Sequence, residues 1–172
     1  MKLLFICRAQ FDYLQDLTYS GLVKQLGASN VIDYPWNPKY HLPLKNYPKN
    51  LGYTGFTWPL FSKKSISGFD AVVIGSAKKE SLLTYESLLP KIKSLPVIFI
   101  DGGDREEIAG DFFRLGLETE FKQIFQKRQP DLIFKREYIP SLHGHLTHVF
   151  PFPFSFPYNL PVQPAKEKTY EV

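Results

Sequence analysis

The residues that could hold a ligand follow short apolar segments and form no familiar catalytic motif. The most distinctive group is Asp101-Gly102-Gly103-Asp104, directly after the apolar run 96–100. Glycines let backbone amides approach a ligand closely, and a flanking carboxylate can accept a hydrogen bond from a sugar hydroxyl. Alternatively, the glycines only form a turn, and Asp104 caps the helix that follows. The sequence leaves both interpretations open.

Three other apolar runs also end in polar or charged groups. Arg8 and Lys78 each supply a positive charge suited to a phosphate or carboxylate. The ligand-binding residues predicted at these positions are Arg8, Gln10, Ser76, Lys78, Asp101, Gly102, Gly103, Asp104 and Arg136. No catalytic residue is identified among them.

Two further groups have a functional and a structural interpretation. In Lys135-Arg136-Glu137, either Arg136 contacts an anion, or Asp101 or Glu137 forms an internal ion pair with a cation. His143, His145 and His148 have a spacing that permits metal binding, but no cysteine or carboxylate adjoins them, which favours surface or packing roles. Cys7 lies in an apolar run and is predicted to be an inert buried thiol. We therefore predict no metal and no cofactor.

Several common nucleotide-binding motifs are excluded. The segment Cys7–Tyr13, which follows the first apolar run, contains no glycine. A dinucleotide-binding fingerprint and a phosphate-binding P-loop both require glycines there. The G-x-S-x-G turn of the α/β-hydrolases is absent as well.

Apolar runs alternate with segments of helical periodicity, which is typical of βα units. Predicted strands are Lys2–Cys7, Val31–Tyr34, Asp70–Ser76, Pro96–Ile100 and Leu132–Arg136, and predicted helices are Asp12–Leu26, Glu80–Lys93, Glu106–Arg114 and Glu118–Lys127. The prolines of Thr147–Pro157 permit an edge strand or a polyproline-like segment there. The predicted fold is α/β: a doubly wound, mostly parallel five-stranded sheet with helices on both faces, Rossmann-like or flavodoxin-like. Ligands of such sheets bind at the carboxyl ends of the strands, where the winding reverses.

The domain organisation follows from the breaks in this pattern. Residues 1–160 are predicted to form one domain, and residues 161–172 a linker or the start of a second domain. A long aromatic- and proline-rich insertion, Pro35–Ser67, follows the second predicted strand. Loops of this length in a compact domain are usually functional or poorly ordered, and the aromatic content favours an ordered segment.

Composition narrows the class of protein. The chain has 172 residues, of which 44% are hydrophobic, 16% aromatic and 22% charged, as expected for one globular domain rather than a disordered chain. One cysteine excludes a disulfide framework. The net charge of +4 comes from scattered lysines and arginines, so no nucleic-acid partner is predicted. No apolar run reaches the ~20 residues of a transmembrane helix, and the amino terminus lacks the features of a signal peptide, so a cytoplasmic location is predicted.

Segments along nearly the whole chain resemble a bacterial family of glycosyltransferase-like proteins related to the spore-maturation protein CgeB. The segments that carry the resemblance are residues 12–16, 21–22, 31–35, 52–57, 69–76, 98–104, 134–138 and 151–157. The resemblance implies that the chain is the amino-terminal, acceptor-side half of a two-domain GT-B protein. It also implies a sugar or glycan acceptor and a second domain that binds the nucleotide sugar.

A second hypothesis is a non-catalytic binding or protein-interaction module. Its contact surface would be the aromatic segment 34–61, which includes Trp36 and Trp58. Exposed aromatic patches commonly mark interfaces, and a homodimer through this segment is one form of the hypothesis.

Overall fold

Short apolar segments form the strands of one sheet in the computed structural model, which describes residues 1–41, 68–92 and 94–153. The elements are, in order, β1 (Leu3–Ile6), α1 (Tyr13–Leu26), the 3-10 turn η1 (Ala28–Asn30), β2 (Val31–Tyr34), α2 (Pro38–His41), β3 (Ala71–Ile74), α3 (Lys79–Ile92), β4 (Val97–Asp101), α4 (Gly110–Arg114), α5 (Glu118–Lys127), β5 (Leu132–Lys135), α6 (Pro140–His143) and β6 (Val149–Pro151). The predicted α/β class is confirmed.

The sheet has six strands in the order β2-β1-β3-β4-β5-β6, and each neighbouring pair is parallel. The predicted count of five was one too low. Residues 149–151 form the sixth strand at the edge, where Pro151 pairs in register with Lys135 and Phe152 N donates to Lys135 O at 2.8 Å. A proline is tolerated there because an edge strand leaves one side of its backbone without a partner strand.

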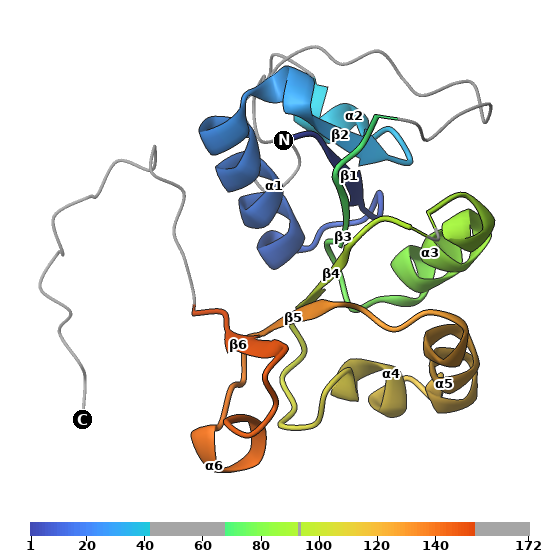
Figure 1. Cartoon of the computed structure of the whole chain (residues 1–172), viewed down its shortest axis with the longest axis vertical. Helices are drawn as coiled ribbons and strands as arrows, with labels where there is room; N and C mark the ends of the chain where they lie inside the picture. The colour runs from blue at the N-terminus through green and yellow to red at the C-terminus, as the bar shows by residue number, and fades with distance from the viewer. Residues whose placement is uncertain (42–67, 93, 154–172) are drawn as a thin grey trace, which may run out of the picture.

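Side-chain alternation along the strands creates a hydrophobic core on each face of the sheet. Leu4 and Ile6 of β1 belong to the core that packs against α3, α4 and α5. Leu3 and Phe5 belong to the other core, which includes Leu14 of α1. Figure 1 shows α1 on one side of the strands and α3, α4 and α5 on the other. Helices on both faces were predicted, and this is confirmed.

The winding of the sheet reverses between β1 and β3. From β1 the chain passes through α1 to β2 on one side, and then returns to β3 on the other side of β1. The carboxyl ends of β1 and β3 therefore lie next to each other, and Gly75 N donates to Ile6 O at 2.9 Å. This is the place where doubly wound sheets bind ligands.

The predicted helix Glu106–Arg114 is shorter than expected and begins at Gly110. Ala109 precedes it with a φ of 60°, in the left-handed region. Its backbone N–H donates to the Asp101 carboxylate at 2.7 Å. The segment between β4 and α4 is held around this carboxylate and does not extend the helix.

Parts of the predicted organisation lie outside the described residues. Residues 42–67 of the insertion and all of the tail 161–172 belong to these parts. The described start of the insertion is partly buried, and the Trp36 ring stacks on His41 at a centroid distance of 5.2 Å. Within the described ranges, no helix combines the length and the apolar character that a membrane span requires.

Two glycine substitutions test how tightly the sheet is packed. A Cβ on Gly75 would lie 2.3 Å from Phe5 Cζ and 3.1 Å from the Ile6 carbonyl oxygen, and Phe5 is fully buried. We expect Gly75→Ala to lower the free energy of unfolding by roughly 1–3 kcal/mol through overpacking. The measurement is urea denaturation.

The matched control is Gly21→Ala. Gly21 lies within α1, and a Cβ there would meet nothing within 4 Å. Alanine favours a helix over glycine, so this variant should gain about 0.5–1 kcal/mol. Equal stability of the two variants would contradict the packing described here.

Candidate functional site

A groove of about 460 Å³ opens beyond the carboxyl ends of β1 and β3. The residues that line it are Arg8, Lys78, Lys79, Glu80, Arg114, Leu115 and Leu117. Four of these side chains are cationic and one is a carboxylate. The groove, which we call the basic groove, lies at the reversal of winding and contains two of the predicted residues, Arg8 and Lys78.

Arg8 is fixed in the groove through its main chain. Its N–H donates to Gln15 Oε1 at 2.7 Å, and Gln15 Nε2 donates back to Arg8 O at 3.1 Å. Asn37 Nδ2 donates to the same carbonyl at 3.0 Å. The guanidinium donates from Nε to Gln10 Oε1 at 3.3 Å and lies 4.0 Å from the Glu80 carboxylate. Gln10, also predicted, thus lies beside Arg8 at the surface.

Lys78 and Arg114 approach the groove from opposite sides of a buried carboxylate. The Lys78 ammonium contacts Asp111 Oδ2, and Arg114 Nε lies 3.5 Å from Asp111 Oδ1. Asp111 is only 4% exposed, whereas Arg114 is about half exposed. The α4 helix therefore contributes both a buried carboxylate, Asp111, and an exposed cation, Arg114, to the site.

A second, much smaller cavity of about 20 Å³ adjoins this carboxylate, and we call it the inner cavity. Lys78 lines both the inner cavity and the basic groove. Ser76 and Asp12 line the inner cavity too, and Ser76 Oγ donates to Asp12 Oδ2 at 2.5 Å. The cavity has room for one water molecule or one hydroxyl group.

The remaining charged residues predicted to bind a ligand, Asp101, Asp104 and Arg136, form ion pairs with other residues of the chain. Asp101 and Lys135 are both fully buried, with Lys135 Nζ 3.2 Å from Asp101 Oδ2. Burial raises the pKa of Asp101, and the Lys135 charge opposes that rise. Arg136 contacts the Asp104 carboxylate, lies 3.2 Å from Glu137 and donates to Tyr13 OH at 2.5 Å. The structure thus contains ion pairs of the kind predicted for Asp101 and Glu137, and the anion contact of Arg136 stays a prediction.

Gly102 and Gly103 pack against protein atoms. A Cβ on Gly102 would lie 2.2 Å from Leu14 Cδ2, and one on Gly103 would lie 3.2 Å from Asp111 Cγ. Gly102 lines the inner cavity. The described residues give Asp104 no capping role, because the α4 N-terminus has no side-chain cap.

Lys79, Arg114 and Asp111 are site residues that the sequence reasoning missed. Lys79 follows directly after Lys78, the last residue predicted to bind a ligand beyond β3. Asp111 and Arg114 lie inside a predicted helix, where polar residues are ordinarily assigned to the solvated face. The turn at Ala109, whose N–H donates to Asp101, precedes this short helix, and Asp111 of the helix contacts Lys78 in the loop after β3.

A buried polar cluster beside the groove was also missed. Asp16 accepts from Lys39 at 2.7 Å and from Tyr40 OH at 2.9 Å, and His41 Nε2 lies 2.9 Å from Asp33 Oδ1. Burial raises the pKa of Asp16, against the lowering effect of Lys39. These contacts fasten α2 to α1 and β2, and so hold the start of the insertion.

Cys7 and His143 are buried and make hydrogen bonds within the protein, whereas His145 and His148 are exposed. The Cys7 thiol is buried and donates to Pro35 O at 3.3 Å, and burial raises its pKa. His143 is buried, with Nδ1 accepting from Ile139 N and Nε2 2.8 Å from Glu106 O. Across the described ranges, no group of three or more potential metal ligands comes together.

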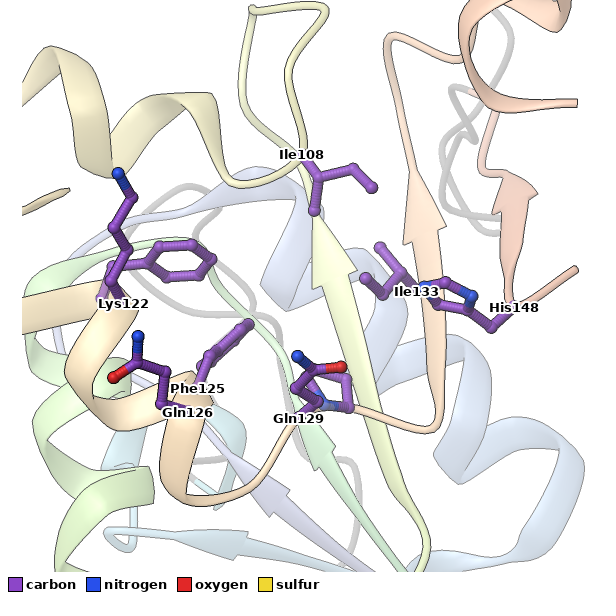
Figure 2. Close-up of a pocket in the computed structure, with 9 residues that line it drawn as sticks. Ile108, Lys122, Phe125, Gln126, Gln129, Ile133 and His148 are labelled. Carbon is purple, nitrogen blue, oxygen red and sulfur yellow. The ribbon is translucent and has the colours of Figure 1, made fainter. Parts of the chain in front are cut away.

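A third cavity, of about 270 Å³, lies along β5 and contains none of the predicted ligand-binding residues. Figure 2 shows α5 side chains, including Phe125, on one side of it, Ile133 and His148 on the other, and Ile108 above. Its lining is mainly apolar, and Lys122, Gln126 and Gln129 stand at its rim. It is separate from the reversal of winding.

Comparisons with protein-family models, with curated proteins and with solved structures find no match to this chain. The site must therefore be interpreted from its own geometry.

The Lys135–Asp101 pair gives a prediction with a defined pH dependence. In Lys135→Met the Asp101 carboxyl keeps its burial and loses the cation that opposes the rise in its pKa. A group whose pKa is raised on folding contributes stability at pH values below its unfolded pKa, and this contribution is lost as the pH rises through the folded pKa. Lys135→Met should therefore cost about 3–5 kcal/mol near neutral pH and clearly less at about pH 5.

Urea denaturation at the two pH values measures this difference. The control is the double variant Lys135→Met/Asp101→Asn, which has no titratable group at this position and should show no such pH dependence. A loss in Lys135→Met that is the same at both pH values would contradict the prediction.

Proposed function

We propose that this chain is the acceptor-side half of a glycosyltransferase-like protein. In this proposal it binds a sugar or glycan at the basic groove, and transfer requires a second half that holds the nucleotide sugar. The resemblance to the CgeB-related family motivates the proposal. It is supported by the α/β fold and by the position of the groove.

The observation that carries the proposal is the position of the basic groove at the reversal of winding. The carboxyl ends of β1 and β3 meet there, and Arg8 and Lys78 reach the groove from the loops that follow these strands. Open α/β sheets bind their ligands at this place because neighbouring crossovers leave on opposite faces and open a crevice. A volume of about 460 Å³ accommodates a monosaccharide or disaccharide unit.

The side chains of the groove fit a hydroxyl-bearing ligand. Guanidinium and ammonium groups donate hydrogen bonds, and the half-exposed Glu80 carboxylate accepts them. Leu115, 46% exposed, adds an apolar surface against which the carbon face of a sugar ring can lie. An open groove contacts its ligand from one side only. We therefore expect a dissociation constant on the order of millimolar.

The alternative, a non-catalytic interaction module, stays a prediction. Most of its proposed contact segment, 42–61, lies outside the described residues, including Trp58. Sedimentation at high protein concentration tests the homodimer form of the hypothesis, which a persistent monomer would exclude.

The experiment is an NMR titration of the 172-residue chain, with maltose and a panel of nucleotide sugars as probes. We expect maltose to shift the amide signals of Arg8, Gln10, Lys78 and Lys79, and we expect no transfer or hydrolysis of a nucleotide sugar. Arg8→Ala should weaken binding about threefold to tenfold, because a charged donor is lost. The matched control is Lys24→Ala, which removes a cation from the last turn of α1.

Two results would overturn the proposal. One is robust transferase activity of this chain alone. The other is a set of shifts confined to His145 and His148, at the amino end of β6.

A further inference from the structure

Asp111 carries a buried oxygen atom without a hydrogen-bond partner. Its Oδ2 contacts the Lys78 ammonium. Its Oδ1 lies 3.5 Å from Arg114 Nε in an ion pair, but it accepts no hydrogen bond from the described residues. The side chain is 4% exposed. The Arg114 contact supplies charge but no hydrogen bond, so Oδ1 keeps an unused acceptor position that a hydroxyl group from outside the protein can fill.

The inner cavity provides the space for that donor. Asp111 lines it together with Ser76, Asp12 and Lys78, and its volume is about 20 Å³. One hydroxyl group fits, whereas a sugar ring does not. Since Lys78 also lines the basic groove, a ligand in the groove can extend a single hydroxyl into the cavity.

The basic groove favours a negatively charged ligand. Arg8, Lys78, Lys79 and Arg114 line it, against the carboxylates of Glu80 and the adjoining Asp111. Arg114 is 53% exposed and Lys79 is exposed, so both can turn towards a ligand. With Asp12 of the inner cavity also counted, four cations against three carboxylates leave an excess of one positive charge.

The start of α3 adds to this charge. The helix has 14 residues and begins at Lys79, in the wall of the groove. Its first backbone N–H groups lack partners within the helix and carry a partial positive charge. An anionic group placed there meets these amides as well as the side chains of Lys79 and Arg114.

We propose that the site binds a hydroxylated anion, either a sugar phosphate or a sugar acid. The anionic group lies among Arg8, Lys79 and Arg114 in the basic groove, and one hydroxyl enters the inner cavity and donates to Asp111 Oδ1. Asp111 thus has the hydroxyl-binding role that the sequence suggested for Asp101 and Asp104. This inference rests on the proposed function in taking the ligand to be a carbohydrate, and it adds the charge of that ligand.

Isothermal titration calorimetry with four probes tests the inference: glucose 6-phosphate, glucuronate, glucose and inorganic phosphate. We expect glucose 6-phosphate or glucuronate to bind at least about tenfold more tightly than glucose and than inorganic phosphate. Whichever of the first two binds more tightly identifies the anionic group. The preference over glucose should fall as salt is added, because the groove is exposed to solvent.

Three variants separate the two parts of the site. Lys79→Gln and Arg114→Gln should each lower the affinity for the charged sugars about threefold to tenfold. The affinity for glucose should fall less, because glutamine keeps a hydrogen-bond donor and loses only the charge. Asp111→Asn should remove the preference for glucose 6-phosphate over inorganic phosphate. It should not lower the affinity for inorganic phosphate. The matched control is Lys122→Gln, which removes an exposed cation of α5 and should change none of these affinities.

A measurement on the unmodified protein keeps the test independent of whether Asp111→Asn folds. The ¹³Cγ signal of the Asp111 carboxylate should shift with glucose 6-phosphate or glucuronate and stay unchanged with inorganic phosphate.

The outcomes distinguish this inference from the proposed function. If glucose binds at the groove as tightly as the charged sugars, the inference is wrong and the proposed function stands. If inorganic phosphate matches glucose 6-phosphate and the Asp111 signal does not move, the hydroxyl subsite is wrong. If no sugar binds at the groove, both the inference and the proposed function are wrong.

Discussion

The buried ion pair between Lys135 and Asp101 determines the shape of the candidate site. It joins the carboxyl ends of β5 and β4, and each partner also bonds to the segment that follows β4. Lys135 Nζ donates to Arg105 O at 2.6 Å, and Asp101 accepts from Ala109 N at 2.7 Å. The segment therefore wraps around two buried charges and ends where α4 begins. Without this arrangement α4 would not bring Asp111 and Arg114 to the groove.

The opposite wall of the groove depends on the first turn of α1. Asp12 caps the helix by accepting from Gln15 N, and the Gln15 amide holds the Arg8 main chain. Leu14 packs closely over Gly102, so this wall is in contact with the end of β4. The two walls come from segments about a hundred residues apart, and both are held by internal contacts. Such a site is formed before any ligand arrives, which reduces the ordering cost of binding.

The sequence predicted the elements of the fold better than the residues of the site. Apolar runs such as residues 3–6 and 97–100 identify buried parallel strands, and Val31–Tyr34 and Glu118–Lys127 were predicted with the bounds that the structure has. The strand order predicts the general location of the site, so Arg8 and Lys78 could be identified as site residues from the sequence. Asp111 and Arg114 could not be identified in this way, because their position depends on the direction that the turn at Ala109 gives to a helix of five residues.

The sequence analysis offered an ion pair of Asp101 as one of two interpretations, and strand pairing identifies Lys135 as its partner. In a parallel sheet, residues paired in register have their side chains on the same face, and Asp101 pairs with Lys135. Val97 and Phe99 precede Asp101 on that face, and Ile133 precedes Lys135, all of them in one hydrophobic core. Asp101 and Lys135 each follow core residues on the same face of their strand, and they pair in register. Their side chains must therefore meet inside the protein. Since burial without a partner would be costly for either charge, the pairing itself is the reason that both residues stand there.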